Sequence, residues 1–215
     1  STGLSETMAR RLGFADIVTV INASPDKPGF MEGKLLVTKL VADSKSGRIL
    51  GAQCVGPGNV NRQIAQWSMA IQGRLTVEDV VNSDLPYAPP FSLAIDHGVA
   101  AAHILQNKMK GRMKGISCAE VHKKVTAGET PFLLDVRQPE EFEQMRLGIG
   151  ETLMPLGALR KRLNELPQDK GKEIICYCKI SLRGYEAALV LEGNGWKNVK
   201  VMEGGVAAWP YPREK

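Results

Sequence analysis

Hydrophobic and polar positions follow one pattern in the first half of the chain and another in the second. In the first half, β-prone runs cover residues 17–21, 34–42 and 48–56. The last two runs are joined by Asp43–Gly47, whose Asp, Ser and Gly residues are typical of a hairpin turn. This half is therefore predicted to contain three antiparallel strands.

Helices are predicted before and after these strands in the sequence. Ser5–Leu12 opens on a residue that favours a helix N-cap. Residues 60–73 carry apolar side chains at steps of four, three and four, which predicts a helix with one face packed on the sheet. Those side chains are Val60, Ile64, Trp67 and Ile71. Prolines in the segment 84–90 favour an extended chain, and residues 92–107 are predicted to form a last helix.

From Ile116 onward, helical segments alternate with short apolar runs. The predicted helices cover residues 118–126, 139–144, 157–166 and 183–192. The predicted strands cover residues 132–137, 173–177 and 198–202. Alternation of this kind is typical of an α/β fold with a parallel sheet. The chain is thus predicted to have an α+β domain over residues 1–107 and an α/β domain over residues 116–215.

The charge distribution places most of the positive excess between these two domains. The chain has 28 Lys and Arg against 23 Asp and Glu, a net charge of +5. Residues 108–115 hold four basic and no acidic side chains, while each half is nearly neutral. We predict a solvated linker here, because a protein that binds nucleic acid normally spreads many basic side chains over one face. A nucleic-acid or nuclear-targeting patch is the alternative, and no nucleic-acid partner is expected.

The composition of the chain argues against a membrane protein and against a secreted protein held together by disulfides. Apolar runs are too short to span a membrane, and the amino terminus lacks the layout of a signal peptide, so no membrane association is expected. Four scattered cysteines favour a reducing, cytoplasmic compartment over a disulfide framework. No spacing of His and Cys matches a metal site. Because residue 1 is Ser rather than Met, we expect the chain to be part of a longer protein.

The segment Cys178–Gly184 carries the candidate chemistry. It lies between a predicted strand and a predicted helix, the place where open α/β sheets hold their sites. Backbone N–H groups of such a loop and the helix dipole form an anion cradle, and Lys179 and Arg183 add positive charge. These groups stabilise a thiolate, so Cys178 is predicted to be a nucleophile. The cradle residues are Lys179, Ile180, Ser181, Leu182, Arg183 and Gly184.

Loop length indicates what the cradle accepts. Four residues separate Cys178 from Arg183, whereas the phosphatase type of loop has five and surrounds a tetrahedral phosphate. The shorter loop favours a single terminal sulfur.

The other cysteines are predicted to pack in the two cores. Cys176 shares the strand face of Cys178 but lies deeper in the sheet, and its alternative role is a resolving thiol. Cys54 and Cys118 are interpreted as packing residues.

Three further polar positions are interpreted as structural. Asp135 and Arg137 stand at a strand end, where we expect a buried pair with Glu140 or Glu141. His97 lies in an Ala-rich helical segment and is expected to pack.

The first half resembles a known domain. Thr2–Ser5 (TGLS), Gly51–Gly56 (GAQCVG) and Asp84–Ser92 (DLPYAPPFS) are similar to the dimerisation domain of flavin-dependent pyridine nucleotide-disulfide oxidoreductases, on the branch of the coenzyme A-disulfide reductases and NADH oxidases. His97 departs from that family's usual Pro. The resemblance implies a homodimer in which Tyr87 approaches the partner's active site and hydrogen-bonds the reacting sulfur or coenzyme A. The alternative for Tyr87 is a plain interface residue.

The same resemblance implies which cofactors the intact enzyme uses. In that family, flavin and nicotinamide folds with a G-x-G-x-x-G turn precede the dimerisation domain, and no such turn occurs in these 215 residues. We therefore expect no cofactor within this chain. FAD, NAD(P)H and coenzyme A are implied for the full-length enzyme.

The second half resembles the rhodanese family. Leu133–Phe142 (LLDVRQPEEF), Tyr177–Gly184 (YCKISLRG) and Val201–Trp209 (VMEGGVAAW) are similar to that family's three signatures in order and spacing, while Leu147–Pro155 departs from it. The resemblance implies a sulfurtransferase in which Cys178 carries a persulfide between a sulfane sulfur donor and a thiol acceptor. A non-catalytic binding module and a phosphatase-like site remain the alternatives.

Overall fold

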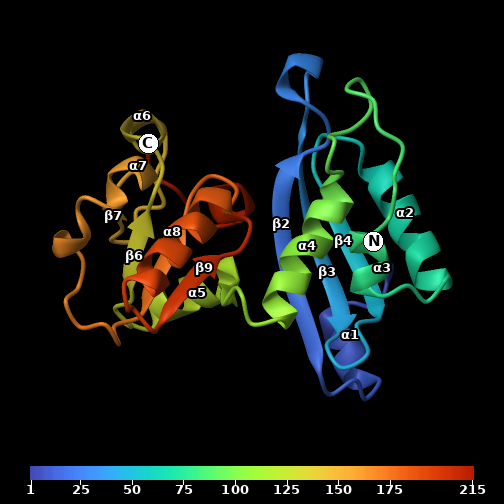
Figure 1. The fold of residues 1–215 in the computed structure, drawn as a ribbon, viewed down its shortest axis with the longest axis horizontal. Coiled ribbons are helices and arrows are strands. Elements are labelled where there is room, and N and C mark those ends of the chain that lie inside the picture. The colour runs from blue at the N-terminus through green and yellow to red at the C-terminus, as the bar shows by residue number, and fades with distance from the viewer. The chain divides into compact units, whose positions relative to one another are not determined.

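The computed structural model describes all 215 residues, which form two compact units, residues 1–112 and 113–215 (Figure 1). Their boundary falls inside the basic segment 108–115. Both ends of that segment belong to regular elements rather than to a linker. The last helix of the first unit continues to Met109, where the Lys108 ammonium donates to the Thr19 carbonyl at 2.8 Å, and Gly115 begins a strand of the second unit.

An antiparallel sheet forms the base of the first unit. Its strand order is β1 (Thr2–Gly3), β4 (Ile49–Val55), β3 (Leu35–Asp43) and β2 (Ile17–Pro25). The three predicted strands and the β3–β4 hairpin are confirmed. The short strand β1 was not predicted, because its two residues are ordered by pairing with β4 rather than by any local pattern.

Helices cover this sheet. They are α1 (Glu6–Arg11), α2 (Val60–Gln72), α3 (Val77–Val81) and α4 (His97–Met109). Helix α2 packs on β4, and α4 packs on β2 and β3 (Figure 1). The predictions for α1 and α2 are confirmed, and α3 is an additional short helix that begins with a Thr76–Asp79 capping box.

Helix α4 begins five residues later than predicted. Asp96 has an extended backbone and its carboxylate accepts from the Gly98 N–H at 2.8 Å, which makes it the N-cap. Arg62 and Gln63 of α2 hold the same carboxylate, at 3.0 Å and 3.1 Å. The helix therefore starts where a tertiary contact fixes its cap.

A buried polar network explains why β2 extends beyond residue 21. His97 is fully buried, and its ring nitrogens bond the hydroxyls of Ser24 and Thr38 at 2.7 Å and 2.8 Å. The Asn22 amide donates to the His97 carbonyl at 3.1 Å. Asn22 and Ser24 interrupt the apolar pattern of β2, and His97 of α4 provides the hydrogen-bond partners of their side chains. His97 thus packs, as predicted, through hydrogen bonds.

The His97 network predicts acid sensitivity of the first unit. Burial lowers the pKa of His97 below its ordinary value of 6.5, although nearby Asp96 opposes the shift. As the pH falls below about 6.5, His97 binds a proton in the unfolded chain before it does so in the folded chain, so the free energy of unfolding falls as pH falls. Urea unfolding measured from pH 7.5 to 5 is expected to show this slope, and His97→Gln to flatten it. Replacing His103, which is exposed on the same helix, by Gln should leave the slope in place; equal slopes in all three proteins would contradict the prediction.

A parallel sheet forms the second unit. Its strand order is β5 (Gly115–Ile116), β9 (Val199–Met202), β8 (Ile174–Tyr177), β6 (Phe132–Asp135) and β7 (Thr152–Leu153). All four pairings are parallel, which confirms the predicted α/β class.

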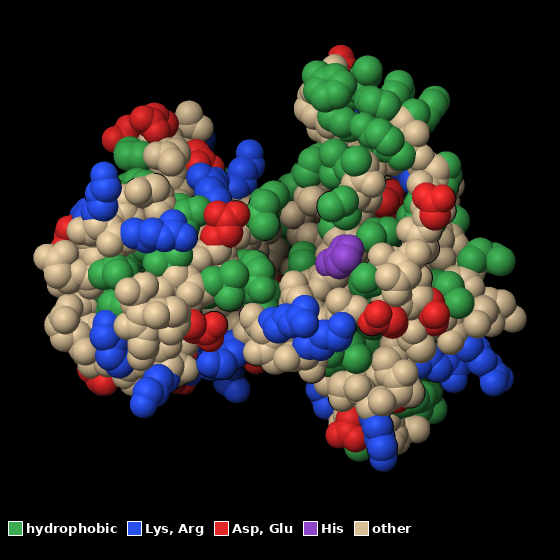
Figure 2. Space-filling view, viewed as in Figure 1, with side chains coloured by type: hydrophobic (Ala, Val, Ile, Leu, Met, Phe, Trp, Pro, Cys, Tyr) green, Lys and Arg blue, Asp and Glu red, His purple; other side chains and the backbone are tan.

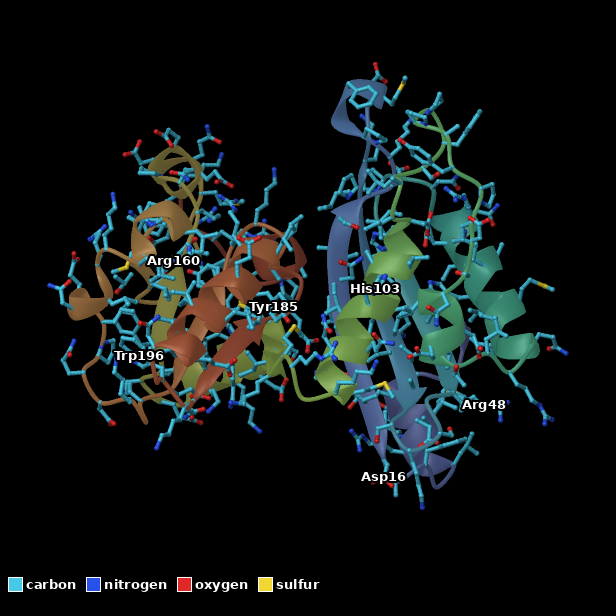
Figure 3. All side chains as sticks on the ribbon, in the orientation of Figure 1. Asp16, Arg48, His103, Arg160, Tyr185 and Trp196 are labelled. Atoms are coloured by element: carbon cyan, nitrogen blue, oxygen red, sulfur yellow. The ribbon has the colours of Figure 1, made fainter.

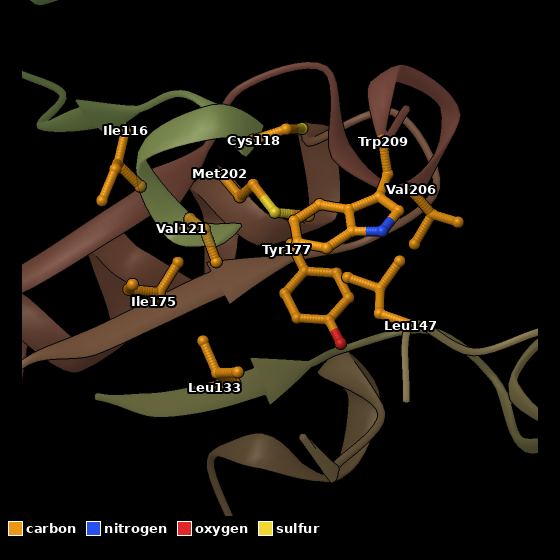
Figure 4. Close-up of a cluster of buried hydrophobic side chains, with 10 residues drawn as sticks. All are labelled: Ile116, Cys118, Val121, Leu133, Leu147, Ile175, Tyr177, Met202, Val206 and Trp209. Atoms are coloured by element: carbon orange, nitrogen blue, oxygen red, sulfur yellow. The ribbon is translucent and has the colours of Figure 1, made fainter. Parts of the chain in front are cut away.

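The helices of the second unit are α5 (Cys118–Thr126), α6 (Pro139–Gln144), α7 (Leu156–Leu159) and α8 (Leu182–Gly193), with a 3₁₀ turn at Gly205–Ala208. The prediction of one helix over 157–166 is wrong: α7 is a single turn, and residues 163–165 form a separate 3₁₀ turn. A buried cluster joins α5 to the sheet and includes Cys118, Tyr177 and Trp209 (Figure 4).

No helix of either unit is long and apolar enough to cross a membrane.

Candidate active site

Cys178 is the first residue after β8 and is 1% exposed. The loop that follows turns sharply into α8, and Ser181 adopts a left-handed backbone with φ of 79° immediately before the helix. Left-handed non-glycine residues are uncommon and cluster at functional sites. The chain therefore places a cysteine at the carboxyl end of a parallel strand, beside a helix N-terminus.

The N-terminus of α8 has no side-chain cap. Ser181 stands at the N-cap, but its hydroxyl donates to the Met202 carbonyl at 2.5 Å instead of accepting from the helix. The first backbone bond to this turn runs from the N–H of Tyr185, which lies one turn into α8 (Figure 3), to the Ser181 carbonyl. N–H groups of a first helical turn have no acceptor within the helix, so this end is available to an anion.

Two glycines let backbone segments close around the loop. A Cβ on Gly184 would lie 2.8 Å from the Tyr177 Cα. Gly205 has φ of +57°, and a Cβ there would lie 2.3 Å from the Cys178 carbonyl oxygen. That oxygen accepts from the Val206 N–H at 3.0 Å, so the 3₁₀ turn holds the cysteine backbone in place.

Replacing Gly205 by Ala is expected to displace this turn from the loop. The added methyl meets backbone and the φ favours glycine, so the free energy of unfolding should fall by about 1–3 kcal/mol. Urea unfolding measures the loss. Gly193→Ala is the matched control, because a Cβ there meets no atom within 4 Å. A Gly205→Ala protein as stable as the control would show that the close approach is not required.

Arg183 is held by a residue that the sequence pattern does not single out for the site. Its guanidinium donates to both carboxylate oxygens of Glu141, at 2.7 Å and 2.8 Å. This bond lowers the pKa of Glu141 to about 2. It also raises the pKa of Arg183, and neighbouring Cys178 adds to that rise. The structure thus brings Cys178, Arg183 and Glu141 together.

The predicted buried pair exists with different partners. Arg137 donates to the Asp135 carboxylate at distances down to 2.7 Å, and both side chains are at least 97% buried. Neither Glu140 nor Glu141 supplies the carboxylate, because Glu141 turns to Arg183. Arg137 bonds the carbonyl of Glu141 instead, at 3.1 Å. Burial raises the pKa of Asp135, and the Arg137 guanidinium opposes that rise.

The other three cysteines have environments that disfavour a thiolate. Cys176 is fully buried, and burial raises its pKa. Burial also raises the pKa of Cys118 to about 12, and it raises the pKa of Cys54. Each fits the packing role predicted from the sequence.

The remaining predicted site residues are exposed to different degrees. Lys179 is exposed, Ile180 is half-buried and Leu182 is 62% exposed. Tyr87 belongs to the first unit and is 53% exposed. Other large apolar side chains exposed on the same unit are Phe30, Phe91 and Ile95, and Figure 2 shows apolar side chains gathered at one end of this unit.

The segment 147–155, which departs from the rhodanese pattern, is organised by Glu151. Its carboxylate accepts from the N–H groups of Leu147, Gly148 and Ile149 at 2.8–3.0 Å. One acidic side chain therefore shapes this loop locally.

Comparison with protein families finds a match for each half of the chain. Residues 1–99 match the family described as the pyridine nucleotide-disulphide oxidoreductase dimerisation domain, and residues 117–210 match the rhodanese-like domain family. The chain belongs to the rhodanese-like family, because it also covers 90% of the putative sulfurtransferase YtwF of Bacillus subtilis at 33% identity. Its first unit matches the dimerisation-domain family. The first unit is accordingly called the dimerisation domain below, and the second the rhodanese-like domain.

Solved structures similar to the chain contain both domains. One is an NAD-dependent persulfide reductase from A. fulgidus, with 38% identity and a TM-score of 0.85 over 96% of this chain. Another is Bacillus anthracis CoADR-RHD in its reduced form, with 32% identity and a TM-score of 0.86 over 97% of this chain. The chain spans 36% of each.

A curated relative is similar over about half of the chain. The NAD(P)H sulfur oxidoreductase (CoA-dependent) of Pyrococcus abyssi is 35% identical over 105 residues, which are 49% of this chain and 23% of that protein.

The rhodanese-like domain does not fit a dinucleotide. The turns after β6 and β8 run through Val136–Gln138 and Cys178–Ser181, and neither contains the glycines that let backbone approach a pyrophosphate. These two turns therefore offer no pyrophosphate site. No three His, Cys, Asp or Glu side chains come together in a way that could hold a metal ion.

Proposed function

We propose that the rhodanese-like domain transfers sulfane sulfur through a persulfide on Cys178. The observation that carries this proposal is the position of Cys178 before the uncapped N-terminus of α8, whose N-cap hydroxyl is turned away to the Met202 carbonyl. An anion on the cysteine would gain the helix dipole and the neighbouring Arg183. The relatives named for persulfide and sulfur reduction support the same chemistry.

The transfer takes place in two balanced displacements. The Cys178 thiolate attacks the outer sulfur of a donor; a new S–S bond forms, the donor's S–S bond breaks, and the donor leaves with the electron pair. An acceptor thiolate then attacks the outer sulfur of the Cys178 persulfide and releases the Cys178 thiolate. No external oxidant or reductant is consumed. Backbone N–H groups of residues 179–184 stabilise the anion before and after each step.

Mass spectrometry of the intact chain tests the proposal. After incubation with thiosulfate or a thiol persulfide, the peptide containing Cys178 is expected to gain the mass of one sulfur atom, and cyanide is expected to remove that sulfur as thiocyanate. No gain with any donor would favour a non-catalytic binding module. Hydrolysis of an aryl phosphate that depends on Cys178, without sulfur loading, would favour a phosphatase-like site.

The dimerisation domain is proposed to pair two copies of the chain. Its exposed apolar side chains support this, because large exposed apolar patches mark interaction sites (Figure 2). In the intact enzyme, which would carry FAD and NAD(P)H, Tyr87 would reach the partner's reacting sulfur or coenzyme A. Sedimentation that shows only monomer at high concentration would overturn the dimer proposal.

A further inference from the structure

The cationic side chain beside Cys178 is already paired with a carboxylate of the protein. Arg183 uses two N–H groups on the two oxygens of Glu141, and the pair is about 30% exposed on both sides. Its charge is therefore shared between the cysteine and a carboxylate that is ionised throughout the neutral range. A bidentate pair of this geometry is directional, and it occupies two of the guanidinium N–H groups.

Glu141 is held in this position by its own helix. Its carboxylate accepts from the Gln138 N–H at 3.2 Å, and its carbonyl accepts from the buried Arg137 at 3.1 Å. Arg137 also donates to the Met145 carbonyl at 2.9 Å, just beyond the end of α6. The Gln138 N–H thus holds the Glu141 carboxylate, and Arg137 holds the backbone of α6 at Glu141 and just beyond its end. These contacts keep the carboxylate beside Arg183.

Glu141 has a consequence for the sulfur donor. We propose that Glu141 makes the Cys178 site select donors that carry one negative charge, thiol persulfides (RSS⁻), over doubly charged donors such as thiosulfate. This inference rests on the proposed sulfur transfer. The N-terminus of α8 supplies about half a positive charge, and Lys179, the residue after Cys178, carries another positive charge. Together they compensate a single negative charge on the donor. A second charge meets the Glu141 carboxylate instead of a free guanidinium.

Both donors react by the same balanced displacement. With a persulfide, Cys178–S⁻ and RSS⁻ give the Cys178 persulfide anion and RS⁻. With thiosulfate, Cys178–S⁻ and S–SO₃²⁻ give the same persulfide anion and sulfite. The two reactions differ in the charge of the donor that must enter the site. The ratio of their rates therefore measures the effect of the site's charge on donor choice, and a general loss of activity leaves this ratio unchanged.

The test compares rates of sulfur loading onto Cys178 with the persulfide of 2-mercaptoethanol, which carries one negative charge, and with thiosulfate, followed by mass spectrometry on the full chain. The wild type is expected to favour the persulfide. Glu141→Gln removes the negative charge that is paired with Arg183, and we expect the persulfide-to-thiosulfate rate ratio to fall about tenfold. Glu141→Asp keeps the charge and should keep the preference. Glu140→Gln, an exposed neighbour on α6, is the matched control and should leave both rates unchanged.

The outcomes separate this inference from the sulfur-transfer proposal. A wild type that loads from thiosulfate as fast as from persulfide overturns the selectivity and leaves sulfur transfer standing. An equal loss with both donors in Glu141→Gln also overturns it, because Glu141 would then only position Arg183. A wild type that loads from neither donor overturns the proposed function, and this inference with it.

Discussion

Replacement of Cys178 by Ser is expected to abolish sulfur loading and thiocyanate formation, with a rate loss of at least about a thousandfold. A serine hydroxyl at this position stays protonated near neutral pH and cannot accept a sulfane sulfur as a stable persulfide. The fold should be unaffected, since the two side chains are nearly the same size. Urea unfolding and rate measurement on the same preparation check both statements.

Cys176→Ser is the matched control for this variant. Cys176 lies two residues earlier on β8 and is fully buried, with burial raising the pKa of its thiol. We expect it to retain the loading rate of the wild type per folded molecule. If Cys176→Ser lost loading and Cys178→Ser kept it, the assignment of the nucleophile would be wrong.

Replacement of Arg137 by Ala is expected to lower the free energy of unfolding of the rhodanese-like domain by about 3–5 kcal/mol. The change leaves the Asp135 carboxylate buried without its cation, and it leaves the carbonyls of Glu141 and Met145 without their donor. Breaking one side of a buried pair costs far more than the pair itself contributes. Urea unfolding followed by circular dichroism measures the loss.

The exposed pair between Arg162 and Glu165 is the control for Arg137. It has a comparable distance, 2.6 Å, but both side chains are more than 40% exposed. Arg162→Ala is expected to leave the urea midpoint unchanged, because solvent screens such pairs. Equal effects of the two substitutions would contradict the importance of burial.

Elements with a strong local signal were predicted within one or two residues. The helices α2 and α5 and the hairpin β3–β4 depend on apolar periodicity, caps and turn residues that are adjacent in the sequence. The errors concern elements whose boundaries depend on distant partners. Asp96 caps α4 while Arg62 holds its carboxylate, and β2 continues through Asn22 because His97 satisfies that side chain.

The sequence alone determined the two-domain order, the parallel and antiparallel classes of the sheets, and the candidate loop Cys178–Gly184, because each depends on residues close together in the chain. Only the tertiary structure decided which carboxylate faces which arginine. Glu141 and Arg183 are 42 positions apart and come from α6 and α8, so nothing local in either segment selects the pairing. Their contact depends on the parallel order of β6 and β8, which brings the two following helices to the same end of the sheet. The candidate nucleophile could therefore be proposed from the chain, whereas the carboxylate that faces its arginine required the fold.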